Sequence, residues 1–126
     1  RTRREFAAKQ REAELRTFAD QSVIQLRRAE QLFQSSHDDL AIVEAFRAVE
    51  SAVRRAAIDR GQSYAPRWFE TIAAKLPTRE LQEDFEQFRR LRNMAAHAVE
   101  PVTSEQARKA LAVASRLLSL LSGETA

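Results

Sequence analysis

One arginine, one asparagine and one histidine gather in the stretch RNMAAH, residues 92–97, shortly before Pro101. Histidine gives and takes protons near neutral pH, and the carboxyl end of a helix favours its charged form. These residue types fit either a reaction site or the solvated end of a helix. Which of the two applies depends on the elements that position Arg92, Asn93 and His97.

The composition favours an all-α domain. The chain has 126 residues, enough for one domain with a buried core. It has only two glycines and three prolines, whereas strands and loops would need more turn residues. The absence of cysteine excludes a disulfide scaffold, a thiol nucleophile and cysteine-ligated zinc. The scattered carboxylates suggest no metal, and we expect no other cofactor. No apolar run is long enough to cross a bilayer.

The excess positive charge lies at the amino terminus. Residues 1–18 hold six basic and three acidic residues, whereas the remainder holds fifteen of each sign. A neutral body lacks the broad basic face that is typical of nonspecific nucleic-acid binding. We therefore distinguish a basic helical arm, residues 1–20, from a helical bundle, residues 21–126. The arm is either a solvated helix start or the cytoplasmic flank of a membrane anchor upstream of Arg1.

Five helices are predicted from the 3.6-residue period of the apolar residues and from the stop signals. The first runs from about Glu5 to Ser35. Its first third has little to bury, so it should project from the bundle or pair with another chain. The second helix is expected to have its cap at Asp38 or Asp39 and its end near Gly61.

The remaining helices are shorter. The third carries an apolar set that we assign to the core: Trp68, Phe69, Ile72 and Leu76. Thr78 should cap the fourth helix, and Thr103 with Gln106 should form a capping box for the fifth. Helices that each have one apolar face and short connections predict an antiparallel bundle with a long amino-terminal helix.

Helical geometry places Arg92 on the buried side of the fourth helix. At roughly 100° per residue, Arg92 lies only about 40° from Phe88, the centre of the apolar face. A buried guanidinium needs a carboxylate or another hydrogen-bond partner. On the second helix, Glu50 lies about 40° from Phe46, while Glu44 points outward. We therefore predict an Arg92–Glu50 ion pair, which could equally serve only to fix the register of two helices.

His97 projects nearly opposite the apolar face and stacks one turn beyond Asn93. Arg92 and His97 can therefore converge only if the helix unwinds around residues 95–98 or if two chains meet at an interface. A proline shortly after the histidine favours an early end of the helix. Without convergence, His97 would only cap its own helix.

The arginine, the polar residue after it and the histidine resemble the RX4-6H motif of the HEPN superfamily, helical bundles of higher eukaryotes and prokaryotes. The runs AFRAVESAVRRAA, FRRLRNMAAHA and TSEQARKALAVASRLL extend this resemblance from about Asp38 to Leu121. One subgroup has a tyrosine two residues after the histidine, where this chain has Val99. A function that needs that tyrosine is therefore not expected here.

The resemblance implies two alternative functions. Many HEPN members are metal-independent ribonucleases that act as toxins or defence effectors, with the arginine and histidine of two protomers in one cleft. In this chain, His97 would then be the base or acid for cleavage of single-stranded RNA, and Arg92 would stabilise the phosphoryl oxygens. Asn93 would orient the histidine or the phosphate, and Glu50 would hold Arg92. Other members are noncatalytic binding or dimerisation modules, which fits the cytoplasmic part of a membrane-anchored or multidomain protein. Both alternatives imply a homodimer.

Overall fold

The computed structural model describes residues 2–59, 75–97 and 100–122, without the side chains of residue 11 and residues 14–20. Within these ranges the chain forms only helices and their connections. The helices are α1 (Arg3–Gln34), α2 (Asp38–Asp59), α4 (Arg79–His97) and α5 (Ser104–Leu121). The predicted all-α bundle with a long amino-terminal helix is confirmed. The helix predicted around Trp68 and the cap predicted at Gly61 lie outside the described residues.

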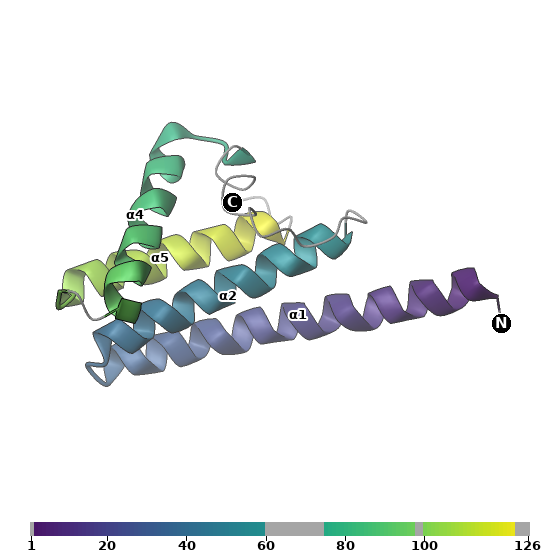
Figure 1. The fold of residues 1–126 in the computed structure, drawn as a ribbon, viewed down its shortest axis with the longest axis horizontal. Coiled ribbons are helices and arrows are strands. Elements are labelled where there is room, and N and C mark those ends of the chain that lie inside the picture. The colour runs from purple at the N-terminus through teal and green to yellow at the C-terminus, as the bar shows by residue number, and fades with distance from the viewer. Residues whose placement is uncertain (1, 60–74, 98–99, 123–126) are drawn as a thin grey trace.

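α2 is the central helix of the bundle. α1 runs antiparallel to α2 along one side, α5 lies along another side, and α4 crosses α2 and α5 at a steep angle (Figure 1). The amino-terminal end of α1 extends well beyond the end of α2 (Figure 1). The side chains of residues 2–10 are exposed, including Phe6 at 63%. The basic arm and the first helix of the bundle thus form one continuous helix.

The core is built mainly from the apolar faces of α2, α4 and α5. The largest fully buried side chains are Phe85, Phe88, Ile42, Leu81, Leu91, Leu117 and Val49. Beside the buried row Ile42, Phe46, Val49 and Val53 of α2 lies a second buried row, Ala41, Ala45, Ala48 and Ala52. Because α1, α4 and α5 all contact α2, its buried surface is much wider than one stripe. Small side chains in the second row let a neighbouring helix pack closely.

The connection between α1 and α2 is a Schellman motif, the 6→1 and 5→2 pattern that often ends a helix. The amide of His37 donates to the carbonyl of Leu32 at 2.8 Å, and the amide of Ser36 donates to the carbonyl of Phe33 at 3.1 Å. Ser36 has a φ of 63°, where glycine is usual. Asp38 is already helical, so His37 precedes the first residue of α2. The predicted cap at Asp38 or Asp39 is therefore wrong, because the left-handed turn at Ser36 lets the helix begin earlier; the two aspartates instead lie in the first turn, where negative charge is favourable.

The predicted caps of α4 and α5 are confirmed. The amide of Leu81 donates to the Thr78 hydroxyl at 3.1 Å. In the capping box of α5, Gln106 N donates to the Thr103 hydroxyl at 3.1 Å, and Thr103 N donates to the Gln106 side chain at 2.9 Å. These bonds satisfy amides that the helix itself leaves without a partner.

We expect Thr103→Ala to lower the free energy of unfolding by about 1 kcal/mol, because α5 is packed into the core and loses its cap. Urea denaturation followed by circular dichroism measures this change. Thr2→Ala is the matched control, since Thr2 forms the same kind of box at the projecting end of α1. That end can fray without unfolding the bundle, so Thr2→Ala should lower the free energy of unfolding much less. Equal losses for the two variants would contradict this assignment.

Candidate functional site

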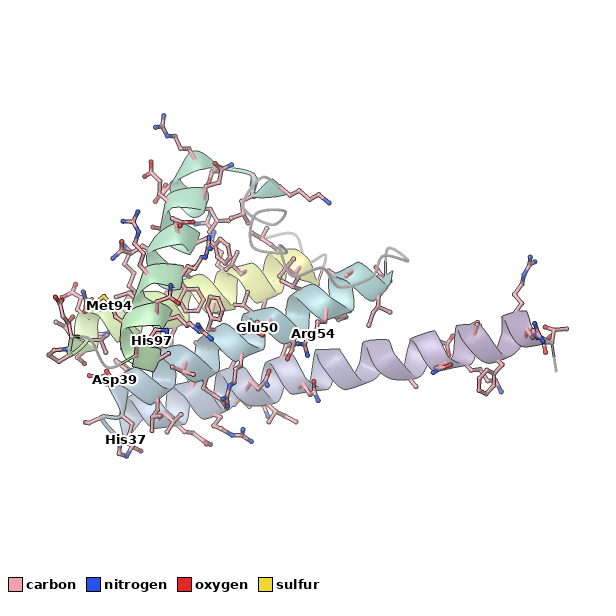
Figure 2. The ribbon with its side chains drawn as sticks, in the orientation of Figure 1. His37, Asp39, Glu50, Arg54, Met94 and His97 are labelled. Carbon is pink, nitrogen blue, oxygen red and sulfur yellow. The ribbon has the colours of Figure 1, made fainter. Side chains whose placement is uncertain are left out.

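The RNMAAH stretch forms the last turns of α4, which remains helical through His97. Asn93 and His97 are both exposed, and their spacing places them one turn apart on the same helix face. Figure 2 shows His97 at the end of α4 that lies near the start of α2. The early unwinding that could have brought Arg92 and His97 together within one chain is not observed in residues 92–97; residue 98 lies outside the described part.

Arg92 is half-buried, and its position depends on both α2 and α4. Its guanidinium carbon lies 5.3 Å from the centre of the Phe46 ring. Phe46 in turn contacts Phe88 edge to face, with the ring centres 5.3 Å apart. A cation over an aromatic face gains about 0.5–1 kcal/mol at a partly exposed site. The arginine stem therefore covers apolar surface while the charged end reaches the edge of the bundle.

Asn93 links the arginine to the exposed face of α4. Arg92 Nη1 donates to Asn93 Oδ1 at 3.2 Å. This bond uses one of the five N–H donors of the guanidinium. The Asn93 side chain thus lies between the guanidinium and the helix face that carries His97. The helical wheel separated Arg92 from His97 correctly by direction, but it did not account for the length and flexibility of the arginine side chain.

The predicted Arg92–Glu50 ion pair is wrong. No ion pair within 4.0 Å joins these two residues in the part of the chain that the structure describes, and Glu50 instead lines a groove between α1 and α2. The physical reason is the incomplete burial of Arg92. Its charge is accommodated by the Phe46 ring and the Asn93 oxygen, so a buried carboxylate is not required.

Glu44 is the buried acid of α2, contrary to the prediction that it points outward. It is 5% exposed, and its two carboxylate oxygens accept from Arg28 Nη1 at 3.1 Å and Arg47 Nη1 at 3.3 Å. The helical wheel failed here because α1 covers the side of α2 that lies away from Phe46. Arg28 and Glu44 are equally far from Ser36 in sequence, so pairing residues across the short α1–α2 connection would have found this contact.

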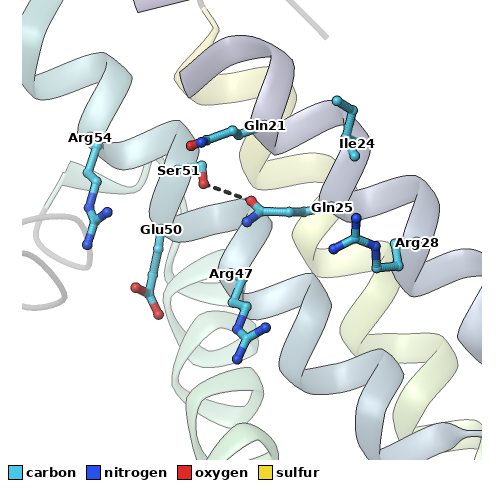
Figure 3. Close-up of a pocket in the computed structure, with 8 residues that line it drawn as sticks. All are labelled: Gln21, Ile24, Gln25, Arg28, Arg47, Glu50, Ser51 and Arg54. Atoms are coloured by element: carbon cyan, nitrogen blue, oxygen red, sulfur yellow. Dashed lines mark hydrogen bonds between the residues drawn. The ribbon is translucent and has the colours of Figure 1, made fainter. Parts of the chain in front are cut away.

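The groove beside this ion pair was missed at the sequence level. It has a volume of about 370 Å³ and is lined by Gln21, Ile24, Gln25, Arg28, Arg47, Glu50, Ser51 and Arg54. Figure 3 shows these side chains on α1 and α2, with Gln25 and Ser51 pointing toward each other. The hydroxyl of Ser51 and the side-chain amide of Gln25 are hydrogen-bonded across it at 2.7 Å. Without knowledge of the partner helix, arginines such as Arg28 and Arg54 indicate only solvated helix faces.

Within the described residues, no group of three histidine, aspartate or glutamate side chains could hold a metal ion. In the same part of the chain, no helix is both long enough and apolar enough to span a bilayer.

The fold and the site define a class: an all-helical domain with a polar site at the end of α4 and a charged groove between α1 and α2. The family model described as "Domain of unknown function (DUF4145)" matches residues 27–124, which include RNMAAH. The chain belongs to this family.

One solved structure shares the fold. It is a crystal structure of the protein TT1696 from Thermus thermophilus, has a TM-score of 0.74 and is 20% identical, covering 88% of this chain and 98% of that chain. At this identity the similarity concerns the fold alone. Comparison with curated proteins finds no significant match.

Proposed function

We propose that this domain is a HEPN-like, metal-independent ribonuclease that cleaves single-stranded RNA as a homodimer in the cytoplasm. The observation that carries the proposal is the exposed His97 at the end of α4, one turn after an Asn93 that is hydrogen-bonded to Arg92. The resemblance of RNMAAH to the RX4-6H motif supplies the reaction class. An exposed histidine can transfer protons to and from RNA, and an arginine can bind a phosphate.

The chemistry requires only groups that RNA and this motif supply. His97 removes the proton of the 2′-hydroxyl, and that oxygen attacks the adjacent phosphorus. The bond from phosphorus to the 5′-oxygen breaks, and the leaving oxygen takes a proton from an acid. The products are a 2′,3′-cyclic phosphate and a free 5′-hydroxyl. Arg92 stabilises the charge on the phosphoryl oxygens, and Asn93 orients its guanidinium.

A homodimer explains how arginine and histidine can act on one phosphate. In the regular α4 helix, Arg92 turns toward Phe46 while His97 lies on the exposed face. In a pair of chains that meet at these helix ends, the arginine of one chain can lie beside the histidine of the other. The two histidines of the dimer would then supply both the base and the acid.

We expect His97→Ala and Arg92→Ala each to lower the rate of RNA cleavage at least about a hundredfold, the low end for a general acid or base. The assay follows a labelled single-stranded RNA with the purified domain in the presence of a chelator. The product ends are analysed for cyclic phosphate. His37→Ala is the histidine control: His37 is exposed in the α1–α2 connection, outside RNMAAH, and has no role in the proposed chemistry, so its loss should leave the rate unchanged. Thermal unfolding of each variant verifies its fold.

A noncatalytic dimerisation module is the second candidate. Exposed apolar side chains on α1 favour it: Phe6 at 63%, Ile24 at 54% and Val23 at 49% exposure. Such a module could be the cytoplasmic part of a membrane-anchored or multidomain protein. A wild-type domain that leaves RNA intact and sediments as a dimer would support this function and contradict the ribonuclease.

A further inference from the structure

The groove between α1 and α2 has an excess of positive charge. Arg28, Arg47 and Arg54 line it, against Glu50 at the groove and the buried Glu44 beneath it. Figure 3 shows the three guanidinium groups on both walls of the groove, with Arg28 on α1 and the other two on α2. The volume of about 370 Å³ lies within the usual range of ligand sites. The charge favours an anionic ligand.

Glu44 prearranges two of these arginines. Its carboxylate holds Arg28 Nη1 at 3.1 Å and Arg47 Nη1 at 3.3 Å, one from each helix. The two arginine side chains are nevertheless 59% and 63% exposed, because the carboxylate contacts them from the buried side only. Holding flexible arginines in place in advance lowers the entropy that a ligand must overcome on binding. The remaining N–H donors of each guanidinium are suited to hydrogen bonds with phosphate oxygens.

The arginines on α2 form a row rather than a single point. Arg47 and Arg54 are seven residues apart, which is about 10 Å along the helix axis. A row of this length matches a ligand with repeated phosphate groups better than an isolated phosphate. Along the axis of α2, the Arg47 end of the row is level with Phe46, whose ring contacts the guanidinium of Arg92.

We infer that the α1–α2 groove binds the phosphodiester backbone of single-stranded RNA and leads the strand toward RNMAAH. The identity of this ligand rests on the proposed function. Arg47 and Arg54 contact successive parts of the backbone, and Ser51 and Gln25 supply hydrogen-bonding groups between the two helices. Glu50 lies between the two arginines in sequence and repels the phosphates. Its charge weakens binding.

The test compares two substitutions in the groove, one expected to weaken RNA binding and one expected to strengthen it. The probe is a fluorescein-labelled single-stranded RNA in which every 2′-hydroxyl is methylated, so that it cannot be cleaved. Fluorescence anisotropy measures its affinity at several salt concentrations. Arg54→Gln should weaken binding roughly fivefold and reduce the slope of log affinity against log salt by about 0.7, the value for one phosphate contact on a single strand. Glu50→Gln should instead tighten binding by a similar factor.

Arg79→Gln is the matched control, since Arg79 is 91% exposed at the start of α4, outside the groove. It should leave the affinity unchanged. The inference is overturned if the wild type does not bind the probe, or if both groove variants bind like Arg79→Gln. If the wild-type domain cleaves RNA but both groove variants bind the probe as tightly as the wild type, the inference is overturned and the proposed function stands. If the two groove variants change the RNA affinity in opposite directions but the wild-type domain cleaves no RNA, the inference about the groove is supported and the proposed ribonuclease function is overturned.

Discussion

Phe88→Ala should lower the free energy of unfolding by about 3–5 kcal/mol, the usual cost of removing a buried phenylalanine side chain. Phe88 is 1% exposed, and its ring contacts Phe46 edge to face across the α2–α4 crossing. The substitution removes a large apolar group and leaves a cavity where these two helices meet. Because small domains are stable by only about 5–15 kcal/mol, this is a large share of the total. Urea denaturation followed by circular dichroism measures the loss.

Phe6→Ala is the matched control for this prediction. Phe6 is 63% exposed on the projecting end of α1, so the same substitution there should change stability by about 0.5 kcal/mol or less. A loss below about 1 kcal/mol for Phe88→Ala would show that the core does not depend on the α2–α4 crossing. The result also bears on the candidate site, because Phe88 packs against Phe46, whose ring contacts the guanidinium of Arg92.

The double variant Arg28→Ala/Arg47→Ala should lose about 3–5 kcal/mol, far more than the sum of its two single variants. Each arginine alone can compensate the charge of Glu44, and both lie largely in solvent, so each single loss should be about 1 kcal/mol or less. Removing both leaves a carboxylate that is 5% exposed without either of these partners. Chemical denaturation of the wild type, the two single variants and the double variant gives the coupling free energy between the two arginine substitutions.

A third substitution distinguishes lost charge compensation from lost packing. Adding Glu44→Leu to the double variant removes the stranded charge and fills the site with an apolar side chain of similar size, which should restore most of the lost stability. Additive losses, or a triple variant as unstable as the double, would contradict the charge explanation. Because Arg28 and Arg47 have this structural role, the RNA-binding test uses Arg54 and Glu50 instead.

Local features of the chain allowed much of the fold to be predicted. The 3.6-residue apolar period and the scarcity of glycine and proline predict helices, because side-chain burial and backbone propensity act over a few residues. The caps at Thr78 and Thr103 were also predictable, since a hydroxyl that bonds an amide three residues later needs no distant partner. The cap of α2 was not, because the left-handed turn at Ser36 lacks the usual glycine.

The candidate site was predictable only in part. The residues of RNMAAH and the exposed face shared by Asn93 and His97 follow from their spacing on one helix. The partner of Arg92 did not follow, because a long side chain can carry its charge to a ring on another helix or to its own neighbour.

By itself, the sequence determined that this chain is helical, where α4 and α5 begin, and which face of α4 carries His97. Only the tertiary structure decided that Glu44 is buried, that Glu50 lines a groove, and that three arginines from α1 and α2 line the same groove. The physical reason is that burial depends on which helices cover a surface. A helical wheel assumes one buried face, whereas α2 is covered on several sides by helices from distant parts of the chain.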